Sequence, residues 1–150
     1  MGKILSLLLL VLCIEPTALS EVTVHQEFYP YYKEYTDTLR SVCPKYVTPK
    51  NIDVRFVTRP KDATWVGLCS KWSGNKDFLV QISADFWFFP EFTRYRRVLL
   101  FHEFSHCFLS VPHSMDNSNY MYKQVIPISD VILSIQYMQD IKAMCDTLGN

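Results

Sequence analysis

Three of the four histidines in this 150-residue chain lie within twelve residues of one another, at His102, His106 and His113. The first two belong to the pattern His-Glu-x-x-His, and residues four apart lie on one face of a helix, one turn apart. Two imidazoles placed in this way can bind a single metal ion. The pattern therefore requires a helix that runs through residues 102–106.

The third histidine constrains the fold further, because it follows His106 by seven residues. If the helix continued, the two side chains would lie two turns apart, too far for one ion. A shared site requires the helix to end near Leu109, and Pro112 favours this because proline disfavours helical backbone at the residue before it. A catalytic zinc needs three protein ligands and an open position. We therefore expect His113 as the third ligand, with Asp116 as the alternative.

Glu103 directly follows the first expected ligand and should project toward the open coordination position. A carboxylate there can take a proton from a zinc-bound water and later deliver it to the leaving amine. These residues predict a zinc-dependent peptide hydrolase with Glu103 as the general base. The competing interpretation is a domain without metal, in which the histidines are exposed or hydrogen-bonded and the glutamate is solvated.

The stretch HEFSHCFLSVPH, followed by NSNYMY, resembles the metzincin-type zinc metallopeptidases. It is similar especially to short bacterial and phage metallopeptidases with HExxH, a third histidine and a Met-turn. The resemblance implies that the three histidines bind one Zn²⁺ and that Glu103 is the general base. It implies that Met121 is the Met-turn methionine beneath the metal, whereas Met115 follows the third histidine too closely. The implied fold is α+β: a small zincin-like domain with a short twisted sheet, an active-site helix and a C-terminal helix.

The chain departs from the common metzincin pattern in the turn after the second histidine. Leu109 replaces a glycine, the third histidine comes one residue later, and Ser110 stands where the short family usually has glycine. Glycine is used where φ is positive, so Ser110 implies strain or a different turn. Lys123 occupies the position where some metzincins have a tyrosine. An alternative function is therefore a zinc-stabilised extracytoplasmic binding domain with little or no turnover.

The first 20 residues have the composition of a secretory signal peptide. Lys3 precedes an apolar run over residues 4–14, and a polar segment ends in Ala18-Leu19-Ser20. The run is too short for an ordinary membrane-spanning helix. We expect a signal peptide over residues 1–20 and a secreted or periplasmic metallopeptidase-like domain over residues 21–150. An uncleaved signal, or lipid attached to Cys13, would instead anchor the protein to a membrane.

Four cysteines remain after the expected signal peptide: Cys43, Cys69, Cys107 and Cys145. An even number of cysteines in an exported chain suggests two disulfides, and four cysteines allow three pairings. The sequence does not choose among these pairings, and Cys107 on the histidine helix with Cys145 on the last helix is one candidate pair. Free buried thiols are the alternative.

Composition limits the partners of the domain. Lys and Arg number 15, as do Asp and Glu, so the formal net charge is zero. This argues against binding nucleic acid through bulk charge. The hydrophobic content of 49% and the charged content of 20% indicate a folded chain. We expect a peptide or protein substrate, no nucleic acid and no membrane span in the mature chain, and the oligomeric state stays open.

Hydrophobic periodicity predicts helices over 28–42, 91–109 and 129–148, and strands over 51–58, 64–72 and 77–84. In the resembling family, the strand before the active-site helix borders the cleft and pairs with an extended substrate, so strand 77–84 is expected there. Residues 86–89 either pack in the core or shape an apolar subsite. The last helix is expected to bury a stripe formed by Ile132, Ile135, Met138, Ile141 and Cys145.

Overall fold

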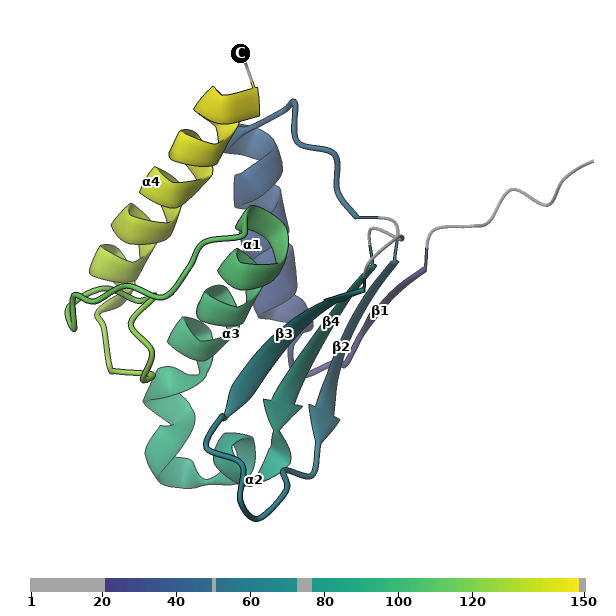
Figure 1. Ribbon diagram of the computed structural model, residues 1–150, viewed down its shortest axis with the longest axis vertical. Coiled ribbons are helices and arrows are strands. Elements are labelled where there is room, and N and C mark those ends of the chain that lie inside the picture. The colour runs from purple at the N-terminus through teal and green to yellow at the C-terminus, as the bar shows by residue number, and fades with distance from the viewer. Residues whose placement is uncertain (1–20, 50, 73–76, 149–150) are drawn as a thin grey trace, which may run out of the picture.

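The computed structural model describes residues 21–49, 51–72 and 77–148. The expected signal peptide over residues 1–20 therefore lies outside the described residues. The described part is an α+β domain in which α1, α3 and α4 lie on one side of a four-stranded mixed sheet (Figure 1). The elements in chain order are β1 (Val22–Val24), α1 (Tyr29–Val42), β2 (Asn51–Val57), β3 (Gly67–Trp72), β4 (Asp77–Ser83), α2 (Ala84–Phe88), η1 (Pro90–Tyr95), α3 (Arg96–Phe104), η2 (Ser105–Leu109) and α4 (Asp130–Leu148).

The strands are arranged in the order β1-β2-β4-β3. The first three are parallel, and β3 runs antiparallel to β4 at the edge of the sheet. The expectation that strand 77–84 borders the cleft is therefore wrong. That strand is β4, which pairs with β2 on one side and β3 on the other, so it is internal and its Val80 and Ile82 are fully buried. The strand that faces the histidines is β3.

The core is strongly aromatic and lies between the sheet and the helices. The predicted first helix is confirmed as α1, which buries Tyr32, Tyr35 and Leu39 at helical spacing. Three of the four aromatic residues at 86–89, the aromatic corner, lie in α2, an element that periodicity did not predict. Trp87 of α2 is fully buried against the sheet side of the core, whereas Phe88 and Phe89 are exposed.

The histidine segment is not one uniform helix, as the periodicity of residues 91–109 predicted. It begins as the 3₁₀ helix η1, continues as the α-helix α3 and ends as the π-helical turn η2. A π-helical turn widens the helix by one residue and is often found at functional sites. The predicted end near Leu109 is confirmed, because Ser110 adopts a left-handed conformation with φ 59°.

The last helix buries part of the predicted stripe. The last three residues of that stripe face the core, with Ile141 fully buried. Ile132 and Ile135 are about half exposed, and Leu133 and Tyr137 of α4 are buried in their place. The reason is that α4 packs mainly on α1 and η2 along one narrow seam.

Two disulfides connect the elements, and neither is the candidate pair Cys107–Cys145. Cys43 at the end of α1 pairs with Cys145 on α4, and Cys69 on β3 pairs with Cys107 on η2. The candidate pair does not form because η2 packs on β3, so Cys107 faces the sheet. Disulfides form in oxidising compartments, and this pattern is compatible with an extracellular location. Among the described helices, none has the length and apolar character needed to cross a bilayer.

Candidate metal centre

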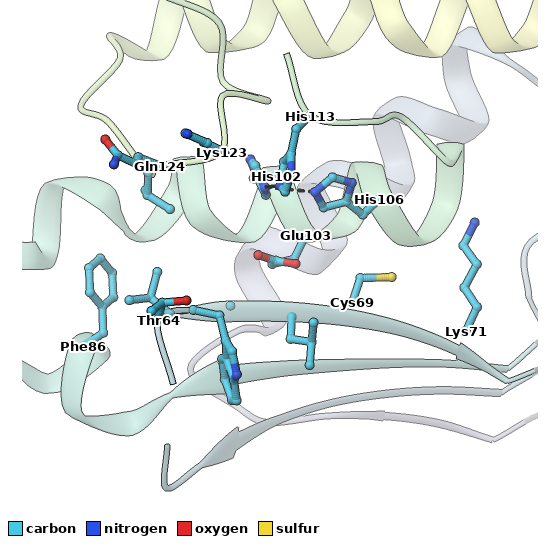
Figure 2. A pocket seen from close by; sticks show the side chains of 15 residues that line it. Thr64, Cys69, Lys71, Phe86, His102, Glu103, His106, His113, Lys123 and Gln124 are labelled. Atoms are coloured by element: carbon cyan, nitrogen blue, oxygen red, sulfur yellow. Dashed lines mark hydrogen bonds between the residues drawn. The ribbon is translucent and has the colours of Figure 1, made fainter. Parts of the chain in front are cut away.

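The three clustered histidines of the sequence meet at one point. His102 lies on α3 and His106 one turn later on η2, while His113 comes from the loop that follows. The Nε2 atom of His102 lies 3.0 Å from that of His106 and 3.2 Å from that of His113. Figure 2 shows the three rings converging at the roof of a cleft. These side chains form a group that could hold a metal ion.

Backbone carbonyls determine which nitrogen of each helix histidine carries a hydrogen. Nδ1 of His102 lies 2.9 Å from the carbonyl oxygen of Tyr120, and Nδ1 of His106 lies 2.6 Å from that of Val111. A carbonyl only accepts hydrogen bonds, so each Nδ1 donates and each Nε2 presents a lone pair. Two lone pairs 3.0 Å apart repel each other when no hydrogen lies between them. A shared cation removes that repulsion.

The protonation and spacing of the site suit a metal ion. Burial lowers the pKa of His102 to about 4 and also lowers the pKa of His106, so both imidazoles are neutral near pH 7. Ligand atoms bound to one tetrahedral Zn²⁺ at 2.0–2.1 Å lie about 3.3 Å apart. The two separations from His102, 3.0 and 3.2 Å, are close to this value, and all three ligand atoms lie within 4.8 Å of one another. The residues present therefore fit a small tetrahedral cation.

The left-handed residue Ser110 makes the turn that recruits His113. Its φ of 59° ends η2, and the next backbone N–H, of Val111, donates to the carbonyl oxygen of Ser105 at 3.2 Å. The chain thereby reverses direction directly after the helix. A non-glycine residue in this conformation costs about 1–3 kcal/mol. The sequence expectation of a strained turn at Ser110 is therefore confirmed.

The loop beyond the turn is fixed by the segment around Met121. The N–H of Ser114 donates to the carbonyl oxygen of Met121 at 2.8 Å, which holds the residue next to His113 in place. Met121 is 1% exposed and belongs to the core, whereas Met115 is 95% exposed. The Met-turn assignment of Met121 stays a prediction. Asp116, the alternative ligand, accepts hydrogen bonds from Ser118 and is not part of the metal-ligating group.

Glu103 lies deep in the same cleft and points toward the edge strand (Figure 2). It is 5% exposed, and its carboxylate accepts a hydrogen bond from the backbone N–H of Cys69. Burial raises the pKa of this carboxyl to about 8. The group is therefore held next to the histidines in a form that can carry a proton near neutral pH.

Gly67 on β3 provides the room for Glu103, and sequence reasoning missed it. A Cβ atom at this position would lie 2.5 Å from Oε1 of Glu103 and 2.7 Å from Cδ1 of Leu99. Only glycine allows the strand to approach the helix this closely. The signal was present in the sequence, because an isolated glycine within a predicted strand often marks a close approach of backbone to another group.

A buried hydrogen-bond network lies behind the first histidine, and it too was missed. The hydroxyl of Tyr120 lies 2.8 Å from Oγ of Ser105 and 2.6 Å from Oδ2 of Asp140, and Oγ of Ser105 also meets the hydroxyl of Tyr35 at 2.9 Å. Because the carbonyl of Tyr120 accepts from His102, this network fixes a partner of a metal-ligating side chain. The network joins four distant parts of the chain, so no local pattern predicts it.

The cleft has a volume of about 630 Å³. The loop before β3 and β3 itself form one wall, α3 and η2 form the other, and residues 123–125 line the side of the histidines. Phe86 also lines the cleft, so the aromatic corner contributes both a core residue, Trp87, and a wall residue. Figure 2 places Phe86 and Lys71 at opposite ends, with the histidines between them.

Comparison of the chain with protein-family models, with curated proteins and with solved structures gives no match in any of the three. The functional argument therefore depends on the geometry of the site.

Proposed function

We propose that this protein is an exported, zinc-dependent endopeptidase of the metzincin-like type. One observation carries the proposal: three histidine Nε2 atoms converge at the roof of an open cleft, and the carboxyl group of Glu103 lies beside them. Three neutral nitrogen ligands with an open fourth position are typical of catalytic zinc sites. The two disulfides support export to an oxidising compartment.

His102, His106 and His113 would hold the ion. Zinc bound in such a site lowers the pKa of water and polarises the carbonyl of a scissile peptide bond. Glu103 supplies the proton transfer, because its carboxyl oxygen can accept a proton and release it to the nitrogen of the leaving amine. Its burial keeps the proton near the reacting atoms and away from bulk solvent.

The edge strand supports an extended peptide as the substrate. Within the described sheet β3 pairs only with β4, so its other edge, apart from the N–H of Cys69 that donates to Glu103, is available for backbone hydrogen bonds along the cleft. Addition of a strand to a free sheet edge is a recurrent mode of peptide recognition. The cleft extends to both sides of the histidines, between Phe86 and Lys71 (Figure 2), which favours cleavage within a chain.

Replacement of Glu103 by Gln tests the proposal. We expect hydrolysis of a mixed peptide library to fall by about 10²–10⁴-fold, while the zinc content of the purified protein remains one ion per chain. The matched control is Glu91→Gln on the exposed helix η1, which should leave both quantities unchanged. Unchanged hydrolysis in the Glu103 variant with zinc still bound would contradict the mechanism.

A second candidate is a zinc-stabilised binding domain without turnover. Its support is the position of Glu103, whose carboxylate is already bonded to Cys69 and packed against Gly67. This candidate predicts stoichiometric zinc, a melting temperature that falls when a chelator is added, and no cleavage in the library. A chain that takes up no zinc, cobalt or manganese when purified without a His-tag would contradict both candidates.

A further inference from the structure

The cleft is lined by two basic side chains that have no acidic partner within the described residues. Lys71 and Lys123 both line it, and neither takes part in an ion pair there. The acidic group among the lining residues is Glu103, which is buried. A divalent ion on the histidines would add two further positive charges. An anionic segment of a ligand would therefore complement this cleft.

Lys71 has a defined position at one end of the cleft. It lies on β3 in register with Gly67 and Cys69, on the strand face that meets the helix. Its Nζ atom donates to Oγ of Ser110 at 2.5 Å and lies 5.5 Å from the ring centre of Phe78. The ammonium group is thus fixed at the mouth of the site, beside η2 (Figure 2).

The partner of Lys71 is the strained residue of the turn. Glycine would relieve the positive φ of Ser110 but would remove the hydroxyl that receives the ammonium group. Strained backbone persists where the surrounding structure imposes it, and it gathers at functional sites. Ser110, in place of glycine, therefore positions the ammonium group of Lys71 near the histidines.

We propose that Lys71, positioned by Ser110, is a specificity-determining residue that binds a carboxylate of the substrate. The inference rests on the proposed function and gives it a substrate class: peptides with Asp or Glu near the scissile bond. A peptide paired with β3 places alternate side chains toward the helix wall. The acidic residue lies on the side of the scissile bond that faces the Lys71 end of the cleft.

Paired peptides test this substrate class. Each pair differs by Glu or Gln at one of three positions on either side of the cleaved bond, and kcat/KM is measured for both. We expect a preference for Glu of about tenfold at one position, on one side only, because a hydrogen bond to a charged group has this effect. Equal rates for Glu and Gln at every position would overturn the inference.

Variants of the lysine assign the preference to Lys71. Lys71→Met should reduce the ratio of kcat/KM for the Glu peptide to kcat/KM for the Gln peptide to about twofold or less. Lys71→Glu should instead make a peptide with Lys at that position the preferred substrate. Lys142→Met on the exposed face of α4 is the matched control and should keep the full ratio. A preference that survives in Lys71→Met would overturn the assignment. The wild-type preference should also shrink in high salt.

Two variants of the turn separate positioning from general stability. Ser110→Ala keeps the strain and removes the hydroxyl, whereas Ser110→Gly removes both. Both should lower the Glu to Gln ratio by about threefold, although the glycine variant should melt at a higher temperature than the wild type. An unchanged ratio in both variants would show that Ser110 has only a structural role.

A binding measurement distinguishes failure of this inference from failure of the proposed function. Fluorescence anisotropy with labelled Glu and Gln peptides is measured on the zinc-loaded Glu103→Gln protein and on its double variant with Lys71→Met. Tighter binding of the Glu peptide that depends on Lys71 would support the inference even if no peptide is cleaved. Cleavage of both peptides at equal rates, with equal binding, would support the function and overturn the inference.

Discussion

The two disulfides stabilise two parts of the molecule that are built in different ways. Cys43–Cys145 joins α1 to α4 in the helix layer, where the buried side chains Leu39, Leu133 and Ile141 are apolar. Cys69–Cys107 joins β3 to η2, the two walls of the cleft, where ionisable groups are buried. The helix layer therefore provides stability through packing, whereas the cleft gives up some stability to bury ionisable groups and to hold a strained turn in place.

Burial of the Glu103 carboxyl should cause the largest loss of stability in the cleft. Its pKa rises from 4.5 to about 8 in the folded protein, so folding favours the neutral acid. The contribution of Glu103 to the stability of the metal-free protein is therefore fully present below pH 4.5 and is lost as the pH rises from 4.5 through 8. Glu103→Gln removes this loss, so the metal-free variant should exceed the wild type in free energy of unfolding by up to about 5 kcal/mol above pH 8.

Urea unfolding of both metal-free proteins between pH 4 and pH 9 measures this difference. The comparison between variant and wild type cancels the titration of His102, which has the opposite sign between pH 4 and 6.5. Loading with zinc should reduce the difference, because a nearby cation favours the ionised carboxylate. A difference independent of pH would show that the carboxyl is not desolvated.

Removal of one disulfide at a time should affect the helix layer and the cleft separately. The chain-entropy relation gives about 4.7 kcal/mol for the 102-residue separation of Cys43–Cys145 and about 3.9 kcal/mol for the 38-residue separation of Cys69–Cys107. We expect the double-alanine variant of the first pair to lose more stability and keep its zinc affinity. The variant of the second pair should lose less stability but bind zinc more weakly, because η2 is no longer tied to β3.

Urea midpoints and zinc titrations on the same samples check this contrast. Both variants must be compared with the wild type under oxidising conditions, and again after reduction of the wild type. Equal loss of zinc affinity in the two variants would show that the metal centre depends on overall stability alone.

His113→Ala tests the cleft through its metal centre and leaves both disulfides in place. The other two ligands lie on the helical segment and remain in place, so the fold should be retained while zinc affinity falls by more than about 100-fold, beyond the range typical of supporting residues. Competition with a chromogenic chelator measures this affinity. Asp116→Ala is the control, since its carboxylate is bonded within its own loop. Undiminished affinity in His113→Ala would require another third ligand.

The contrast between the two parts also explains what the sequence could predict. The histidine site was predictable because its geometry is local: two histidines four residues apart on a helix, and a third that follows seven residues later, after a turn. The strand that borders the cleft and the first half of the buried stripe of α4 were predicted wrongly, and the disulfide pairing was left open, since each depends on contacts between distant segments. Periodicity fixes a helix face only to within one residue, and that error was enough to exchange Ile132 for Leu133. The metzincin resemblance stays a proposal.

Tyr120→Phe should give the smallest effect. It distinguishes a loss of metal affinity in the cleft from a general loss of stability. The hydroxyl of Tyr120 anchors its residue to Asp140 and Ser105, and its carbonyl accepts from His102. Loss of the hydroxyl frees this backbone to move and loosens the ring orientation of the histidine. Substitutions of groups that orient a ligand typically weaken metal affinity by about 10–100-fold, and the lower limit applies because the carbonyl itself is retained.

Tyr137→Phe is the matched control for this prediction. Tyr137 is also a buried tyrosine, but its hydroxyl meets Oγ1 of Thr38 in the helix layer at 3.3 Å, away from the histidines. Each variant removes a hydrogen-bonded phenol, so each should cost about 1 kcal/mol of stability. Only Tyr120→Phe should also weaken zinc binding and change the absorption spectrum of the cobalt form. If both variants weaken zinc binding equally, the network transmits general destabilisation and does not orient His102.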